Sequence, residues 1–110
     1  MAHQLMMIVA NEPSLEKETE YNEWYNQKHV PMLLAFKGMK EAARYHLMGD
    51  NQECSKYISI YEFDNAEDLQ AFPRSPEFAA AVKDFDEKWK NGGFERKWGA
   101  CYELVQSWEK

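Results

Sequence analysis

The sequence predicts an α+β fold with the element order β, α, β, β, α, β, in which two helices cover one face of a four-stranded antiparallel sheet. Three observations favour it: an apolar run of strand length near the amino terminus, a hairpin pattern in the middle, and an amphipathic helix before a last alternating segment. A chain of 110 residues suits one hydrophobic core, so residues 1–110 are expected to form a single domain.

The amino-terminal third predicts a strand followed by a helix. The apolar run HQLMMIVA, residues 3–10, has strand length and ends at the turn-forming tripeptide NEP. Ser14 is expected to cap a helix with acidic residues in its first turn, which runs to about His29. Pro31 is expected to force Val30 out of the helical conformation, leaving only a short turn beyond it.

The rest of the chain predicts a hairpin, a short helical piece, a helix and a strand. Residues 39–48 and 56–63 have strand patterns and are joined by the turn-rich GDNQECS. Asn65 is expected to cap the short piece, and Ser75 before a proline predicts the start of the main helix. That helix has an apolar stripe of Phe78, Val82, Phe85 and Trp89. It is expected to end at NGG, before an alternating strand over residues 94–105.

This order is the split βαβ, or ferredoxin-like, arrangement. In the first and third strands both faces are apolar, with Leu5, Met7 and Val9 opposite Met6 and Ile8, and Tyr57, Tyr61 and Phe63 opposite Ile58 and Ile60. A sheet with one face in water carries polar residues on that face. The apolar second face therefore predicts a homodimer in which two sheets pack face to face.

Composition excludes several classes of function. A net charge of −6 opposes nucleic-acid binding, and the sequence shows no signal-peptide pattern and no apolar run of about 18 residues, so we expect a cytoplasmic protein without a membrane partner. Cys54 and Cys101 lack metal-site spacing and are expected to be free thiols, and no metal site is predicted. The motifs of serine hydrolases, P-loop NTPases, dinucleotide-binding enzymes and zinc proteases are absent from the sequence.

The stretch NEWYNQKHVP gathers aromatic residues and a histidine before a proline. At helical spacing Tyr21, Tyr25 and His29 share one stripe, and Trp24 lies at its margin. In one interpretation the rings are core and His29 is a partly exposed residue near the helix end, and helix geometry alone favours this interpretation. In the other interpretation, the stripe covers an apolar pocket and His29 is the titratable group at the mouth of that pocket.

Two tyrosines of the predicted third strand raise the same question. Tyr57 and Tyr61 share a face, where phenols beside an imidazole could orient or protonate an enolate. Two core tyrosines are the commoner arrangement. One histidine over an aromatic pocket would also suffice as a haem ligand, so haem binding stays open as well.

The run WYNQKHVPMLLAFKGMKEAARY, residues 24–45, resembles the signature of the EthD (ethyl tert-butyl ether degradation) family of the dimeric α+β barrel superfamily. The resemblance implies a ferredoxin-like protomer, a face-to-face dimer and a cavity between helices and sheet. Relatives include polyketide cyclases, isomerases, decarboxylases and haem-degrading monooxygenases. In the family's helix a tryptophan and a histidine before proline correspond to Trp24 and His29.

These observations predict a small homodimer that binds an apolar, aromatic or polyketide-like metabolite. An enzymatic activity would be proton transfer without a cofactor, with His29 as acid or base and Tyr25 or Tyr61 orienting the substrate. The predicted substrate-binding residues are Tyr21, Trp24, Tyr57, Phe85 and Trp89. The alternatives are a non-catalytic accessory protein of an oxidative degradation pathway and a haem-binding monooxygenase.

Overall fold

The computed structural model describes residues 4–110 and has the predicted α+β, ferredoxin-like fold. Its four-stranded sheet has the order β2-β3-β1-β4, and each neighbouring pair is antiparallel. The strands are β1 (Leu5–Pro13), β2 (Met39–His46), β3 (Tyr57–Phe63) and β4 (Phe94–Glu103). The predicted first strand began at residue 3, which lies outside the described residues.

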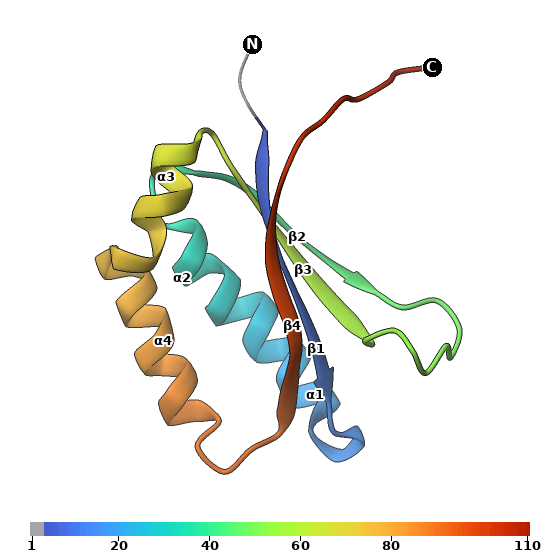
Figure 1. Ribbon diagram of the computed structural model, residues 1–110. Coiled ribbons are helices and arrows are strands. Elements are labelled where there is room, and N and C mark those ends of the chain that lie inside the picture. The colour runs from blue at the N-terminus through green and yellow to red at the C-terminus, as the bar shows by residue number, and fades with distance from the viewer. Residues whose placement is uncertain (1–3) are drawn as a thin grey trace.

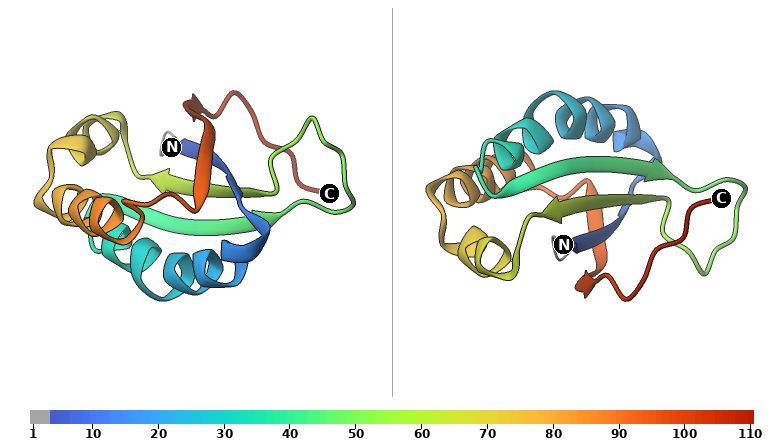
Figure 2. Two further views of the ribbon diagram at one scale, coloured as in Figure 1. Left: turned by 90° about the horizontal axis from the view of Figure 1, so that it is seen from below. Right: turned by 90° about the horizontal axis from the view of Figure 1, so that it is seen from above.

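All helices lie on one face of the sheet, as Figures 1 and 2 show. The first helical region comprises a 3-10 turn (Leu15–Lys17), α1 (Glu18–Trp24), a π-helical segment (Tyr25–His29) and α2 (Val30–Leu34). The second comprises α3 (Ala66–Ala71), a 3-10 turn (Phe72–Arg74) and α4 (Pro76–Lys88).

Pro31 does not end the first helical region, so the prediction that it displaces Val30 from the helical conformation was wrong. Val30 has helical backbone angles, with φ −61° and ψ −46°, and its N–H donates to the carbonyl of Tyr25, five residues earlier. After this wider turn a new α-helix, α2, begins at Val30. Pro31 therefore lies in the first turn of α2, where a missing N–H costs little. His29 therefore lies in the middle of a continuous helical rod.

The second predicted helix begins where its capping residue indicated and ends at Lys88, shortly before the predicted NGG. Ser75 Oγ accepts a hydrogen bond from the N–H of Phe78, and the side chain of Asn65 caps α3 in the same way. Gly93 follows α4 with φ 140°, and a Cβ there would lie 2.5 Å from the Trp89 ring, so the link to β4 needs glycine. Ser14 stands at the predicted cap position, but its side chain accepts no capping hydrogen bond.

The core between helices and sheet consists of two clusters, and the partly buried Val30 packs against both. One is mainly aliphatic and phenyl, and the other is aromatic throughout. The buried members of the first are Leu5, Val9, Leu33, Met39, Tyr61, Phe63, Phe72 and Ala81, and those of the second are Tyr21, Trp24, Tyr25 and Trp89. The boundary between two such differently shaped sets of side chains is a natural place for imperfect packing.

The face of the sheet away from the helices is mostly apolar, as predicted, apart from Glu41 and Glu62, and no described helix or strand covers it (Figure 2). Along β4 the residues on this face pair with Met6, Ile8 and Ala10 of β1. Large rings on it remain open to solvent, since Tyr45 is 56% exposed, Trp98 44% and Tyr102 51%.

Two further predictions concern features outside the core. Cys54 and Cys101 are free and exposed, as expected. Among residues 4–110 no helix has the length and apolar character needed to cross a membrane.

Candidate functional site

A cavity of about 290 Å³ lies between the sheet and the helices, where the two core clusters meet. Its wall is mostly apolar, and five side chains bring polar atoms to it: Tyr25, His29, Tyr61, Asp86 and Arg96. The apolar wall is made by Met7, Val9, Leu33, Phe78, Ala81, Val82 and Phe85. An apolar cavity of about 150 Å³ is enough for benzene, so this one suits a ligand of one or two rings.

His29 is enclosed by aromatic rings. It is 6% exposed and stacks on Trp24 with ring centroids 4.5 Å apart, and it meets the ring of Tyr25 edge-to-face with centroids 4.8 Å apart. The prediction that it stands at the mouth of a pocket was wrong, because the helix continues past Pro31 and carries the imidazole inside. Its Nδ1 atom is buried and has no hydrogen-bond partner among the described residues.

The burial of His29 decides its protonation state. Desolvation, with a smaller contribution from the positive charge of Arg96, lowers the pKa of His29 to about 4 from an ordinary value of 6.5, and the negative charge of Asp84 opposes this only in part. The imidazole is therefore neutral at pH 7 and can accept a proton.

Two phenols face the same cavity. Tyr25 Oη accepts a hydrogen bond of 3.0 Å from Asn11 Nδ2, which leaves its own proton free to be donated. Tyr61 is 1% exposed, and its Oη makes no hydrogen bond of normal geometry to any described residue. Burial raises the pKa of Tyr61, so it stays a neutral phenol and a hydrogen-bond donor.

Of the eight predicted site residues, four line the cavity and four do not. Those at the cavity are Tyr25, His29, Tyr61 and Phe85, and those away from it are Tyr21, Trp24, Tyr57 and Trp89.

The four residues away from the cavity have other partners. Tyr21 and Trp89 are buried in the aromatic cluster. Trp24 lies behind His29 and donates a 2.9 Å hydrogen bond from Nε1 to Asp84. Tyr57 points toward α1 and donates to Glu18 at 2.7 Å.

Several cavity residues could not be identified from the sequence. Arg96 is the most informative, since its Nε donates a 2.9 Å hydrogen bond to Asn11 Oδ1. A bulge between Ala10 and Asn11 shifts the pairing of β1 with β4, so that Arg96 pairs with Asn11. Simple alternation along FERKW did not reveal this, because the bulge depends on the partner strand.

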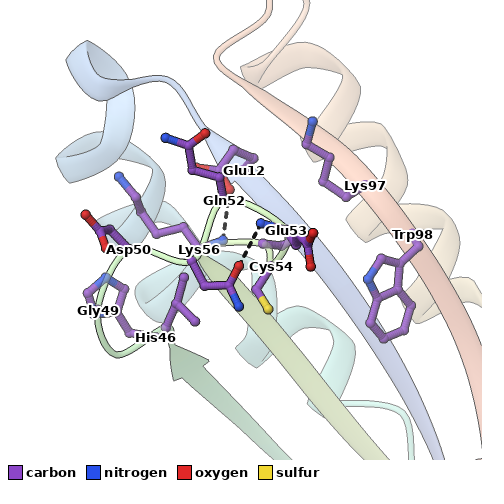
Figure 3. A pocket seen from close by; sticks show the side chains of 13 residues that line it. Glu12, His46, Gly49, Asp50, Gln52, Glu53, Cys54, Lys56, Lys97 and Trp98 are labelled. Atoms are coloured by element: carbon purple, nitrogen blue, oxygen red, sulfur yellow. Dashed lines mark hydrogen bonds between the residues drawn. The ribbon is translucent and has the colours of Figure 1, made fainter.

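A larger hollow of about 490 Å³ lies at the far end of the sheet, between the β2–β3 hairpin and residues of β1 and β4 (Figure 3). It is shaped by the hairpin loop, which is fixed by a 2.8 Å hydrogen bond from the Lys56 N–H to Glu12 Oε1. Most of its lining residues are exposed, and none of the buried, unpaired polar atoms in the described chain belongs to it. The enclosed cavity with its converging polar groups is the stronger candidate.

A metal centre is not indicated at either place. Across residues 4–110 no three His, Cys, Asp or Glu side chains come together as a metal site would require.

The fold is shared with several solved structures. An EthD family protein from Bacillus halodurans C-125 has 16% sequence identity and a TM-score of 0.67, with 94% of this chain and 99% of that chain covered. HapK from Hahella chejuensis has 10% identity and a TM-score of 0.70, covering 96% and 97% of the two chains. A dimeric ferredoxin-like protein of unknown function from Thermobifida fusca YX has 10% identity and a TM-score of 0.65, covering 96% and 93%.

These similarities confirm the EthD-like resemblance at the level of the fold. No curated protein matches the chain. The model of the family described as Domain of unknown function (DUF4286) matches residues 7–94, which is most of the 110 residues. The chain therefore belongs to the DUF4286 family, with an EthD-like, ferredoxin-like fold.

Proposed function

We propose that the protein binds an apolar, oxygenated metabolite of one or two rings in the cavity beneath the π-helical segment. The observation that carries this proposal is that His29 Nδ1 and Tyr61 Oη are both buried without hydrogen-bond partners, and both residues line the cavity. An unpaired buried polar group costs about 1–3 kcal/mol. A ligand oxygen between these groups would offset that cost.

The chemistry that suits these groups is cofactor-free proton transfer. Neutral His29 would take a proton from a carbon next to a carbonyl group, and the electrons of that C–H bond would form an enolate. The phenol protons of Tyr25 and Tyr61 would stabilise the enolate oxygen. Return of the proton to a different carbon gives isomerisation, and attack of the enolate carbon on a second carbonyl group of the same ligand gives cyclisation. In a decarboxylation the enolate would instead form by loss of CO₂ from a β-keto acid, and the same phenols would stabilise its oxygen.

We also propose that the protein is a homodimer that covers its apolar sheet face with a second copy. Tyr45, Trp98 and Tyr102 lie on this face with about half of each side chain exposed. Large contiguous apolar surfaces on one side of a sheet are typical of association surfaces. The similar protein from Thermobifida fusca is described as dimeric.

A non-catalytic binding protein is the second candidate, and the low pKa of His29 favours it. A base with a pKa of about 4 accepts protons poorly from a carbon acid, unless the ligand itself changes that pKa. Binding and accessory roles need only the cavity and its hydrogen-bonding groups.

Exchange of hydrogen for deuterium in 2-tetralone separates the two candidates. This two-ring ketone has acidic protons beside its carbonyl group, and NMR in D₂O follows their loss. Wild-type protein should accelerate exchange, His29→Gln should abolish the acceleration, and the exposed His46→Gln should retain it. Saturable binding without exchange would favour the accessory role, while absence of binding would refute the proposal. A Soret band on titration with hemin would favour the haem alternative.

A further inference from the structure

We propose that Arg96 is a specificity-determining residue that binds a carboxylate, so that the ligand of this cavity is an apolar acid of one or two rings. The inference rests on the proposed function and deepens it. Arg96 is the cationic residue of the cavity lining, and it is itself exposed, which places it where the cavity opens to solvent. The rest of the lining suits a hydrocarbon body, and Arg96 suits a charged end.

The guanidinium of Arg96 is held in position by a buried amide. Its Nε donates to Asn11 Oδ1 at 2.9 Å, and Asn11 is 1% exposed. The amide nitrogen of Asn11 donates to Tyr21 Oη at 2.9 Å and Tyr25 Oη at 3.0 Å, which fixes the direction of its oxygen. A polar network with each partner in place gives the arginine a defined orientation.

The outer part of the same guanidinium is available to a ligand. Of its five N–H donors, the one on Nε is used by Asn11, and no described residue accepts a hydrogen bond from the two terminal nitrogens. Two such nitrogens form a planar fork that matches a carboxylate in a bidentate arrangement.

No acid of the described chain neutralises Arg96. Asp84 is engaged by Lys28, whose Nζ lies 2.9 Å away, and by Trp24 Nε1. Asp86 lines the cavity but forms no ion pair with Arg96 within 4 Å. The cavity therefore holds a cation that lacks an anionic partner, beside a carboxylate that competes with an acidic ligand through its charge alone.

The second arginine near the cavity has a different role. Arg44 lies over the ring of Tyr25, 4.6 Å from its centroid, and donates to Asn26 at 2.6 Å and Asn22 at 3.0 Å. Its terminal nitrogens are bonded to amides and its charge lies over rings, its buried Nε has no partner among the described residues, and it does not belong to the cavity lining.

A carboxylate on Arg96 would also act on His29. The cation of Arg96 helps to lower the pKa of His29, so an anion beside it would cancel that effect and raise the pKa again. An acidic ligand would thus remove the part of the lowering that Arg96 causes and make the imidazole a better base, while the larger part, caused by burial, remains.

The test compares 2-naphthoate with its neutral analogue 2-naphthamide by titration calorimetry. Wild-type protein should bind the naphthoate at least about tenfold more tightly, the effect expected of one charge-assisted pair. Arg96→Gln should remove this preference by weakening naphthoate binding much more than naphthamide binding. Lys97→Gln is the matched control, because Lys97 pairs with Glu95 at 3.1 Å and lines the hairpin hollow.

A second variant, which is expected to bind more tightly, keeps the test decisive if Arg96→Gln folds poorly. Asp86→Asn removes the competing charge and should tighten naphthoate binding about threefold without changing naphthamide binding. Equal affinity of wild-type protein for the two probes would overturn the role of Arg96 and leave the proposed function standing. Failure of both probes to bind would overturn the two together. A purely structural Arg96 would show equal losses for both probes in Arg96→Gln.

Discussion

The imidazole of His29 lies almost parallel to the indole of Trp24, with ring centroids 4.5 Å apart and planes inclined by 21°. Of the two rings, His29 lines the cavity and Trp24 does not. Trp24 packs against the imidazole and is held in place by a hydrogen bond from its Nε1 to Asp84. The neighbours of His29 keep its imidazole neutral, which has consequences for stability and for binding that mutation can measure.

The first prediction concerns stability at low pH. His29 has a pKa of about 4 in the folded protein and an ordinary value of 6.5 when unfolded, so the unfolded state binds more protons between these pH values. The stabilising contribution of the neutral form is complete above about pH 6.5 and is lost as the pH falls toward 4. Urea unfolding should show a loss of about 2 kcal/mol between pH 7 and pH 4.5 that His29→Gln does not share.

His46→Gln is the control for this measurement, because His46 is exposed. It should keep the pH dependence of the wild-type protein. Parallel curves for wild-type protein and His29→Gln would contradict the buried, neutral imidazole.

The second prediction contrasts two tyrosines of β3. Tyr57 Oη donates to Glu18 at 2.7 Å and accepts from Asn22 at 2.8 Å, so Tyr57→Phe should lower the free energy of unfolding by about 1 kcal/mol. Tyr61 Oη is buried without a partner, so Tyr61→Phe should leave stability unchanged or raise it by about 1 kcal/mol.

Ligand binding should respond in the opposite sense. Tyr61→Phe should weaken binding of 2-naphthamide, because the phenol faces the cavity, whereas Tyr57→Phe should not. A stability gain coupled to a loss of binding is typical of residues kept for function. A loss of stability in Tyr61→Phe would show that its hydroxyl has a structural partner.

The fold could be predicted from the sequence further than the site could. Strand and helix order depend on local patterns, and Ser75 and Asn65 act through residues only three positions away. Tyr25, His29, Tyr61 and Phe85 line one cavity, and helix and strand periodicity indicate their inward faces. Local rules succeed where the relevant neighbour is near in sequence.

The missed features depend on distant parts of the chain. Pro31 predicts a helix end from its own chemistry, but the π-helical turn that accommodates it contacts α4 and, through Tyr25, Asn11 of β1. Arg96 reaches the cavity only because β1 has a bulge opposite it. Trp24 was expected at the pocket wall and instead lies one layer behind, because it packs against α4.

The third prediction concerns the open face of the sheet. Trp98 lies on this face, pairs with Ala10 of β1 and is 44% exposed. If a second copy covers this face, Trp98→Glu would bury a charge against an apolar surface and dissociate the dimer. Sedimentation equilibrium should then give the monomer mass at micromolar concentration. Leu15→Glu, at a position 84% exposed beside α1, should leave the mass unchanged. A wild-type monomer would contradict the proposed dimer.

The fourth prediction closes the cavity without touching its polar groups. Val82 lines the cavity from α4 and is 38% exposed, so its side chain stands at the edge where a larger ring can be placed with little strain. Val82→Trp should fill the entrance and weaken binding of both 2-naphthoate and 2-naphthamide by at least about tenfold, while the midpoint of thermal unfolding stays within a few degrees of wild type.

Lys83→Trp is the matched control, since Lys83 is the exposed neighbour on the same helix and does not line the cavity. It adds the same indole to the surface of α4 and should leave both affinities unchanged. Equal binding by Val82→Trp and wild-type protein would place the ligand outside this cavity and direct attention to the hairpin hollow. Loss of binding in Val82→Trp alone would tie the ligand to the space between Phe85, His29 and the sheet, because only that space is altered.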